Sequence, residues 1–142
     1  MDIEFEYEEM LEDYTKLGSM EWDEWGAGGQ LNALEFYIKV DAEVIWSDMD
    51  GNWQGDCFAL IKYKGQYVLW RDSFGSCAGC DSLDGCDLKS GYEYIKSTLN
   101  EGNCRRFLTL DDVKKYVTET EDFLWDGLKS TDLFTFLRSV EK

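Results

Sequence analysis

Residues 56–72 read DCFALIKYKGQYVLWRD, and they give the strongest indication of a β-sheet in the chain. It consists of two short apolar runs separated by Lys64-Gly65, a pair of residues that suits a tight turn. Short apolar runs on either side of a glycine-containing turn are typical of a β-hairpin. We therefore predict two antiparallel strands that meet at Lys64-Gly65.

The sequence before the hairpin extends the predicted sheet. From Leu34 to Trp46 apolar residues alternate with polar ones, as in one half-buried strand or a pair of strands broken near Asp41. The segment DMDGNWQG, residues 48–55, has the composition of a turn. We expect an antiparallel meander of three to four strands over about residues 34–72, with one face on the core.

Helices are predicted before and after these strands in the chain. Apolar residues recur at helical spacing over residues 3–17, and glutamates on the other faces make this predicted helix acidic. A further helix is expected over about residues 90–100, and Thr109 is suited to cap the next one. The C-terminal tail also has apolar residues at helical spacing and should dock on the sheet. The predicted class is α+β.

No proline, internal repeat or linker divides the chain of 142 residues. We expect a single domain over residues 1–142. Its predicted parts, in chain order, are an acidic N-terminal helix and loop (1–33), the sheet (34–72), a Cys/Gly-rich turn (73–88) and a helical half (89–142).

The negative charge is concentrated in the first part of the chain. Residues 1–56 contain 16 acidic residues and two lysines, whereas residues 57–142 contain 14 acidic and 12 basic residues. A negative surface of this size repels nucleic acid and anionic membranes and attracts basic surfaces. We therefore expect a basic partner protein and no direct binding of nucleic acid or membrane. A purely solubilising surface is the alternative.

The candidate partner-binding residues combine carboxylates with tryptophans in predicted loops. Aromatic side chains on loops often anchor protein interfaces, although they also fold back onto a core. The candidates are Glu4, Glu8, Glu9, Glu12, Asp13, Glu21, Trp22, Asp23, Glu24, Trp25, Asp48, Asp50 and Trp53.

Three of the five cysteines lie within FGSCAGCDSLDGC, residues 74–86. Four thiolates, from Cys77, Cys80, Cys86 and the distant Cys104, could hold a structural zinc ion, and Cys77 and Cys80 have the C-x-x-C spacing. A redox pair and a tight connection with small buried cysteines are the other interpretations. We expect no cofactor, with structural zinc as the alternative.

The sequence lacks the residues that several classes of enzyme and metal-binding protein need. The chain contains no histidine, which excludes Ser-His-Asp and Cys-His catalysis, and it has no phosphate-binding glycine motif. Asp48, Asp50 and Asn52 alternate as in a calcium loop, but Trp53 and Ala59 occupy positions that need glycine and glutamate. We expect no enzyme. The N-terminal MDIEFEYEE is unlike a secretion signal, so we expect the protein in a reducing cytoplasm.

Residues 46–86 carry a Q-G-D motif before one strand and G-S-C-x-x-C-D after the next, in the order Gln54, Gly55, Asp56, then Gly75, Ser76, Cys77, Cys80 and Asp81. In these motifs the chain resembles a family of small phage-encoded proteins of uncharacterised function. The resemblance covers under a third of the chain and brings no activity or ligand with it. It implies a small viral or mobile-element protein that works in the cytoplasm of a host cell. The acidic, tryptophan-rich N-terminal segment departs from the family.

Charge and resemblance together suggest an inhibitor. We expect an acidic DNA mimic that binds the basic nucleic-acid groove of a host defence protein, such as a nuclease effector or a regulator, in the manner of anti-CRISPR or anti-restriction proteins. One alternative is a small zinc- or thiol-dependent accessory domain built on Cys77, Cys80, Cys86 and Cys104. Another is a phage housekeeping protein without an inhibitory role.

Overall fold

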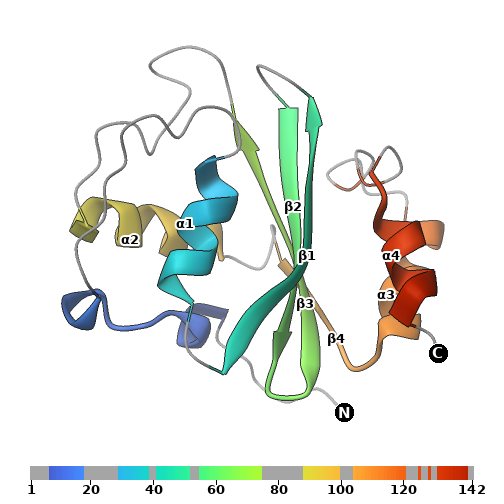
Figure 1. Cartoon of the computed structure of the whole chain (residues 1–142), viewed down its shortest axis with the longest axis horizontal. Helices are drawn as coiled ribbons and strands as arrows, with labels where there is room; N and C mark the ends of the chain where they lie inside the picture. The colour runs from blue at the N-terminus through green and yellow to red at the C-terminus, as the bar shows by residue number, and fades with distance from the viewer. Residues whose placement is uncertain are drawn as a thin grey trace.

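The fold is centred on a four-stranded antiparallel sheet with strand order β1-β2-β3-β4, seen in a computed structural model (Figure 1). The structure describes residues 7–17, 29–38, 41–51, 55–74, 88–99, 104–120, 125, 128 and 131–140. The strands are β1 (Ala42–Gly51), β2 (Gly55–Tyr63), β3 (Gln66–Phe74) and β4 (Cys104–Phe107). The helices are the 3₁₀ helices η1 (Tyr7–Met10) and η2 (Tyr14–Lys16), and α1 (Gly29–Tyr37), α2 (Leu88–Thr98), α3 (Leu110–Glu119) and α4 (Leu133–Val140).

The predicted hairpin is confirmed. Tyr63 pairs with Gln66 across the turn, and both turn residues have positive φ, 51° at Lys64 and 78° at Gly65. Two consecutive residues with positive φ match the right-handed twist of the flanking strands. The turn therefore sets the register of β2 against β3.

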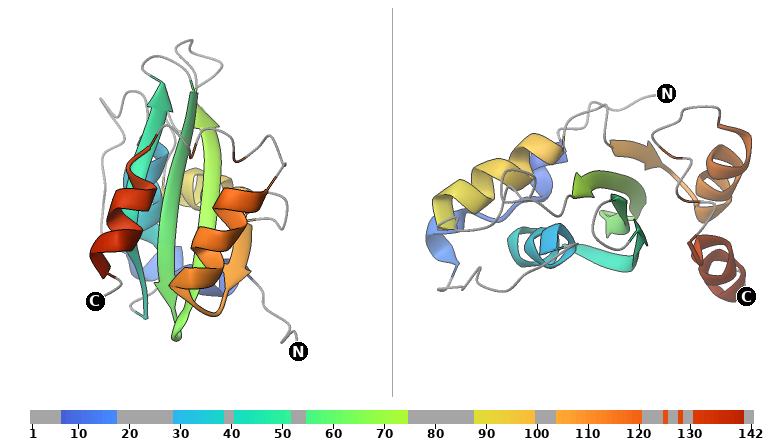
Figure 2. Two further views of the ribbon diagram at one scale, coloured as in Figure 1. Left: turned by 90° about the vertical axis from the view of Figure 1, so that its right-hand side faces the viewer. Right: turned by 90° about the horizontal axis from the view of Figure 1, so that it is seen from above.

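Helices cover the sheet on both faces, so the expectation of one face on the core was too narrow. One core cluster joins the sheet to α1, α2 and the N-terminal segment, and a second cluster joins it to α3 and α4. Figure 2 shows these two helical layers on opposite sides of the sheet. Every residue from Cys57 to Ile61 is fully buried. A strand covered on both faces has no solvent-facing positions, which explains why CFALI is a continuous apolar run.

Side-chain hydrogen bonds fasten the helices to each other and to the sheet. The indole of Trp70 donates to the Thr98 hydroxyl on α2 over 2.9 Å, and the Tyr37 hydroxyl donates to the carbonyl oxygen of Leu88 over 2.7 Å. On the opposite face, the indole of Trp46 donates to the Asp132 carboxylate beside α4 over 2.8 Å. Trp46 and Trp70 are buried, as expected from their positions in strands.

Two predictions about the first half of the chain were wrong. In place of one helix over residues 3–17, the described residues 7–17 form two 3₁₀ helices around Leu11, which makes an isolated β-bridge with Ile38. In place of a strand from Leu34, residues 29–37 form α1, which buries Leu34 and Tyr37. This three-residue spacing puts both side chains on one helical face.

The second half agrees better with the sequence. Helix α2 covers the range expected at 90–100, and the Thr109 hydroxyl caps α3 by accepting from the backbone N–H of Asp112 over 3.1 Å. The C-terminal helix α4 buries Leu133 and Leu137 against the sheet. Strand β4 was not predicted. It has only four residues and one buried side chain, so it leaves no clear period in the sequence.

Candidate acidic interface

Five acidic residues gather where β1 begins. We call this group the acidic end; it comprises Glu9, Glu12, Glu35, Asp41 and Glu43. All are exposed except Glu12, which is half-buried. They come from η1 and the segment that follows it, the last turn of α1 and the start of β1.

Backbone pairing brings these segments together. The N–H of Glu12 donates to the carbonyl oxygen of Tyr37 over 2.6 Å, next to the bridge between Leu11 and Ile38. The Tyr63 hydroxyl donates to the carbonyl oxygen of Glu9 over 3.4 Å, and Tyr63 pairs with Ala42 in the sheet. Glu9 and Glu12 are thereby held beside Asp41 and Glu43, although about thirty residues separate them in sequence.

The carboxylates of the acidic end form no ion pairs with the Lys and Arg residues that the structure describes. In the described part of the chain, none of the five lies within ion-pair distance of a Lys or Arg; the ion pair that is formed joins Arg71 to Asp56 over 2.8 Å. Two described lysines lie near these carboxylates: Lys62 is the cross-strand partner of Glu43 in the sheet, and Lys64 is in the β2–β3 turn. The Lys64 ammonium lies 5.0 Å from the Tyr63 ring centroid, and interaction with Tyr63, followed by the Asp41 and Glu9 charges, raises the pKa of Lys64. These carboxylates are therefore available to an incoming basic group without first breaking an existing pair.

The structure separates the predicted interface residues into two places. Glu9, Glu12 and Asp13 lie at or next to the acidic end, and Glu8 is in η1. The exposed Asp13 carboxylate accepts from the hydroxyl and backbone N–H of Thr15, which lowers the pKa of Asp13. Asp48 and Asp50 lie toward the other end of β1. Outside the described residues are Glu4, Glu21, Trp22, Asp23, Glu24, Trp25 and Trp53.

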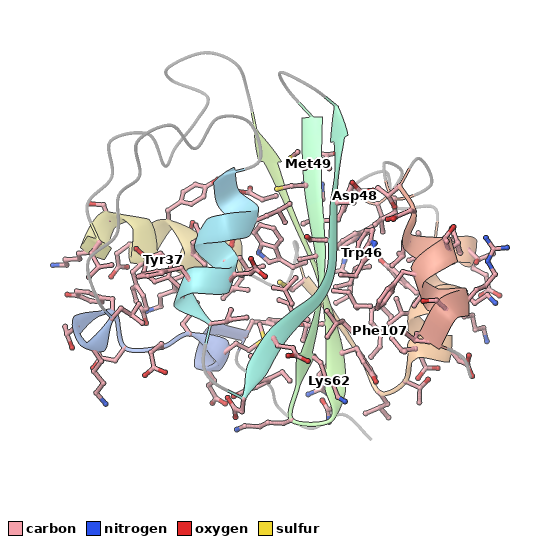
Figure 3. All side chains as sticks on the ribbon, in the orientation of Figure 1. Tyr37, Trp46, Asp48, Met49, Lys62 and Phe107 are labelled. Atoms are coloured by element: carbon pink, nitrogen blue, oxygen red, sulfur yellow. The ribbon has the colours of Figure 1, made fainter. Side chains whose placement is uncertain are left out.

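Asp48 makes contacts within the protein. Its Oδ1 accepts from the backbone N–H of Met49 over 2.8 Å, and its Oδ2 accepts from the backbone N–H of Asp132 over 3.4 Å. Figure 3 shows Asp48 and Trp46 on the side of β1 that faces α4, toward the opposite end of the sheet from Lys62 of β2. Asp48 therefore helps to hold the start of α4 and does not extend the acidic end.

Glu35, Asp41 and Glu43 were not among the predicted interface residues. For Asp41 and Glu43 the sequence held a signal, because residues 40–61 contain five acidic residues and no Lys or Arg; Glu35 lies outside this run. A strand pattern assigned these carboxylates to solvent, but it did not bring them next to Glu9 and Glu12. That proximity depends on the pairing of Leu11 with Ile38, for which local patterns give no indication.

Cys104 is part of the core. It is fully buried on β4 opposite Trp70, and burial raises the pKa of its thiol well above the usual range. Zinc binds the thiolate form, which this environment disfavours. Cys77, Cys80 and Cys86 lie outside the described residues, so the four-cysteine zinc site stays a prediction. Among the residues described, no three Cys, Asp or Glu side chains gather as metal ligands would.

An open hollow lies on the other face of the sheet, near the β2–β3 turn. It is lined by Gly65 and Tyr67, by residues 108–111 at the start of α3, and by Val140 at the end of α4. Leu108 and Val140 are exposed there, at 64% and 42% of their surface. Two exposed apolar side chains, Leu108 and Val140, therefore lie at the same end of the sheet as the acidic residues.

None of the helices in the described ranges is long and apolar enough to cross a lipid bilayer. Comparison of the chain with protein-family models, with curated proteins and with solved structures gave no match.

Proposed function

We propose that this protein is an acidic inhibitor that binds the basic nucleic-acid groove of another protein, with its carboxylates in the place of backbone phosphates. The observation that carries the proposal is the acidic end, where carboxylates from three segments lie at one end of the sheet and none is within ion-pair distance of a Lys or Arg among the described residues. They belong to the part of the chain that holds 16 acidic residues and two lysines. The suggested partner is a defence protein of a host cell, in line with the resemblance of residues 46–86 to phage proteins.

The physical basis is the exchange of counterions. A groove that binds nucleic acid presents Lys and Arg side chains with condensed anions or bound phosphate, and carboxylates can replace these. Complementary charge of this kind speeds association and makes it sensitive to salt. The carboxylates of the acidic end should lose little on binding, because none of them forms an ion pair with a described Lys or Arg.

The test is capture of a partner from host lysate, followed by its identification and a measurement of affinity. The triple variant Glu35→Gln, Asp41→Asn, Glu43→Gln removes three charges from the acidic end. Exposed charge pairs contribute roughly 0.2–1 kcal/mol each, so we expect affinity for the captured partner to fall roughly tenfold.

A matched control removes the same number of charges elsewhere. Glu93 on α2 and Asp111 and Glu119 on α3 are exposed and lie in the nearly neutral part of the chain. The variant Glu93→Gln, Asp111→Asn, Glu119→Gln should bind almost as the natural protein does. Equal losses in the two triple variants would show that only net charge matters, and an unchanged affinity in both would refute the proposal.

A further inference from the structure

The outer edge of β1 has no partner among the described residues. β1 is the first strand in the sheet order and pairs only with β2, from Ala42 opposite Tyr63 to Gly51 opposite Gly55. In the described part of the chain, no backbone hydrogen bond outside the sheet ladder involves residues 42–51. An edge strand leaves every second residue with an N–H and a C=O that point away from the sheet. Along its ten residues β1 therefore presents backbone groups that no described backbone group outside β2 pairs, although the N–H of Met49 donates to Oδ1 of Asp48 over 2.8 Å.

The part of β1 best suited to pairing is Trp46–Gly51. A bulge interrupts the ladder between Val44 and Trp46, and beyond it the register with β2 is regular up to Gly51. Natural edge strands are usually protected by proline, by lysine, by shortness or by a bulge. This segment lies past the bulge and contains neither proline nor lysine.

The side chains along this segment leave room for an extended partner. Ser47 and Met49 are exposed, with Met49 at 41%, and their partners Ala59 and Cys57 face the α1/α2 side of the sheet. Asp48 pairs with Phe58, whose side faces α4, and is only half-buried. A strand that paired here would lie beside Ser47 and Met49 on one face of the sheet and beside Asp48 on the other.

The charge of β1 and its neighbours determines which kind of segment could pair with this edge. Residues 40–61 contain five acidic residues and no Lys or Arg, so a segment rich in Asp or Glu would be repelled along the whole strand. A segment in which Lys or Arg alternates with small or apolar residues would match both faces. We propose that the outer edge of Trp46–Gly51 binds such an extended basic segment of the partner protein by main-chain pairing. This inference rests on the proposed function, because it states how a basic partner is held.

Two peptides test the edge pairing separately from charge. The probe is an eight-residue capped peptide in which Lys alternates with Thr. The control has the same sequence with N-methyl groups on alternate residues, which keep the charge but remove the donors of one edge. Strand addition gains its affinity from main-chain hydrogen bonds. We expect the probe to slow amide hydrogen exchange in Trp46–Gly51 and the control to bind at least tenfold more weakly.

Two variants that change the net charge by the same amount test whether the probe peptide binds at the edge of β1. Met49→Lys places a cation on the edge strand, whereas Leu108→Lys places one on an exposed residue of the other face. Met49→Lys should weaken probe binding at least tenfold, and Leu108→Lys should change it less than threefold.

The outcomes separate the two proposals. Equal binding of both peptides, slowed exchange outside β1, equal effects of the two variants or no binding of the probe would each overturn edge pairing. Charge-driven capture by the acidic end would be untouched by these results, because its own test uses the Glu35, Asp41 and Glu43 variants.

Discussion

At the scale of single residues, burial decides the chemistry of Cys57 and Cys104. Both are free thiols without exposed surface. Desolvation raises the pKa of each well above the usual range, and at Cys57 the negative charge of Asp72 raises it further. The Cys57 thiol also donates to the carbonyl oxygen of Asp72 over 3.5 Å. In this environment the two cysteines pack as small apolar residues and are poor nucleophiles.

This environment predicts the reactivity of both thiols. In the folded protein at pH 8, Cys57 and Cys104 should react with iodoacetamide at least a hundredfold more slowly than in urea, because the reactive thiolate is disfavoured and reagent cannot reach it. Peptide mass spectrometry after timed labelling measures each cysteine separately. Labelling of either residue in the folded protein at the rate of the unfolded chain would contradict its place in the core.

At the scale of elements, the β2–β3 turn is the feature that the sequence specifies most directly. Gly65 has a φ of 78°, which side chains with a Cβ adopt at a cost. An added Cβ at this position would meet no atom within 4 Å. The cost of a substitution here is therefore a backbone cost.

The turn gives a prediction with an internal control. Gly65→Ala should lower the free energy of unfolding by about 1 kcal/mol, and Gly65→Asn should lower it by roughly half as much, because asparagine tolerates positive φ better. Urea unfolding measures both values. Equal losses, or none with alanine, would show that positive φ is not maintained in solution.

Other elements were harder to predict from sequence. Leu34, Phe36 and Ile38 alternate as in a strand, yet Leu31, Leu34 and Tyr37 also fit a helix, and helix packing against α2 and the sheet decides between them. Residues 7–17 have helical spacing, but pairing with the chain after α1 draws Leu11 and Glu12 into extended backbone. Tertiary contacts overrode local preference in both cases. The hairpin, α2 and the cap of α3 were predictable because their signals are local.

At the scale of the whole molecule, charge is distributed unequally over a sheet with helices on both faces. The N-terminal segment, α1 and β1 contribute the acidic end, whereas strands β2 to β4 and helices α2 to α4 supply nearly balanced charge. The sequence located the charge in residues 1–56 correctly but could not show which carboxylates meet. Backbone pairing of Glu12 with Tyr37 and the contact of Tyr63 with Glu9 bring the N-terminal segment to the start of β1, whereas Asp48 accepts from the backbone N–H of Asp132 beside α4.

In the function that we propose, the acidic end occupies the place of nucleic acid on a basic partner. This claim is tested most directly by titrating this protein into the captured partner bound to fluorescent duplex DNA, and measuring anisotropy at several salt concentrations. We predict complete displacement of the DNA, with an affinity that falls steeply as salt rises and a roughly tenfold weaker effect of the Glu35, Asp41 and Glu43 triple variant. A stable ternary complex that retains the DNA, or displacement that does not depend on salt, would contradict the account.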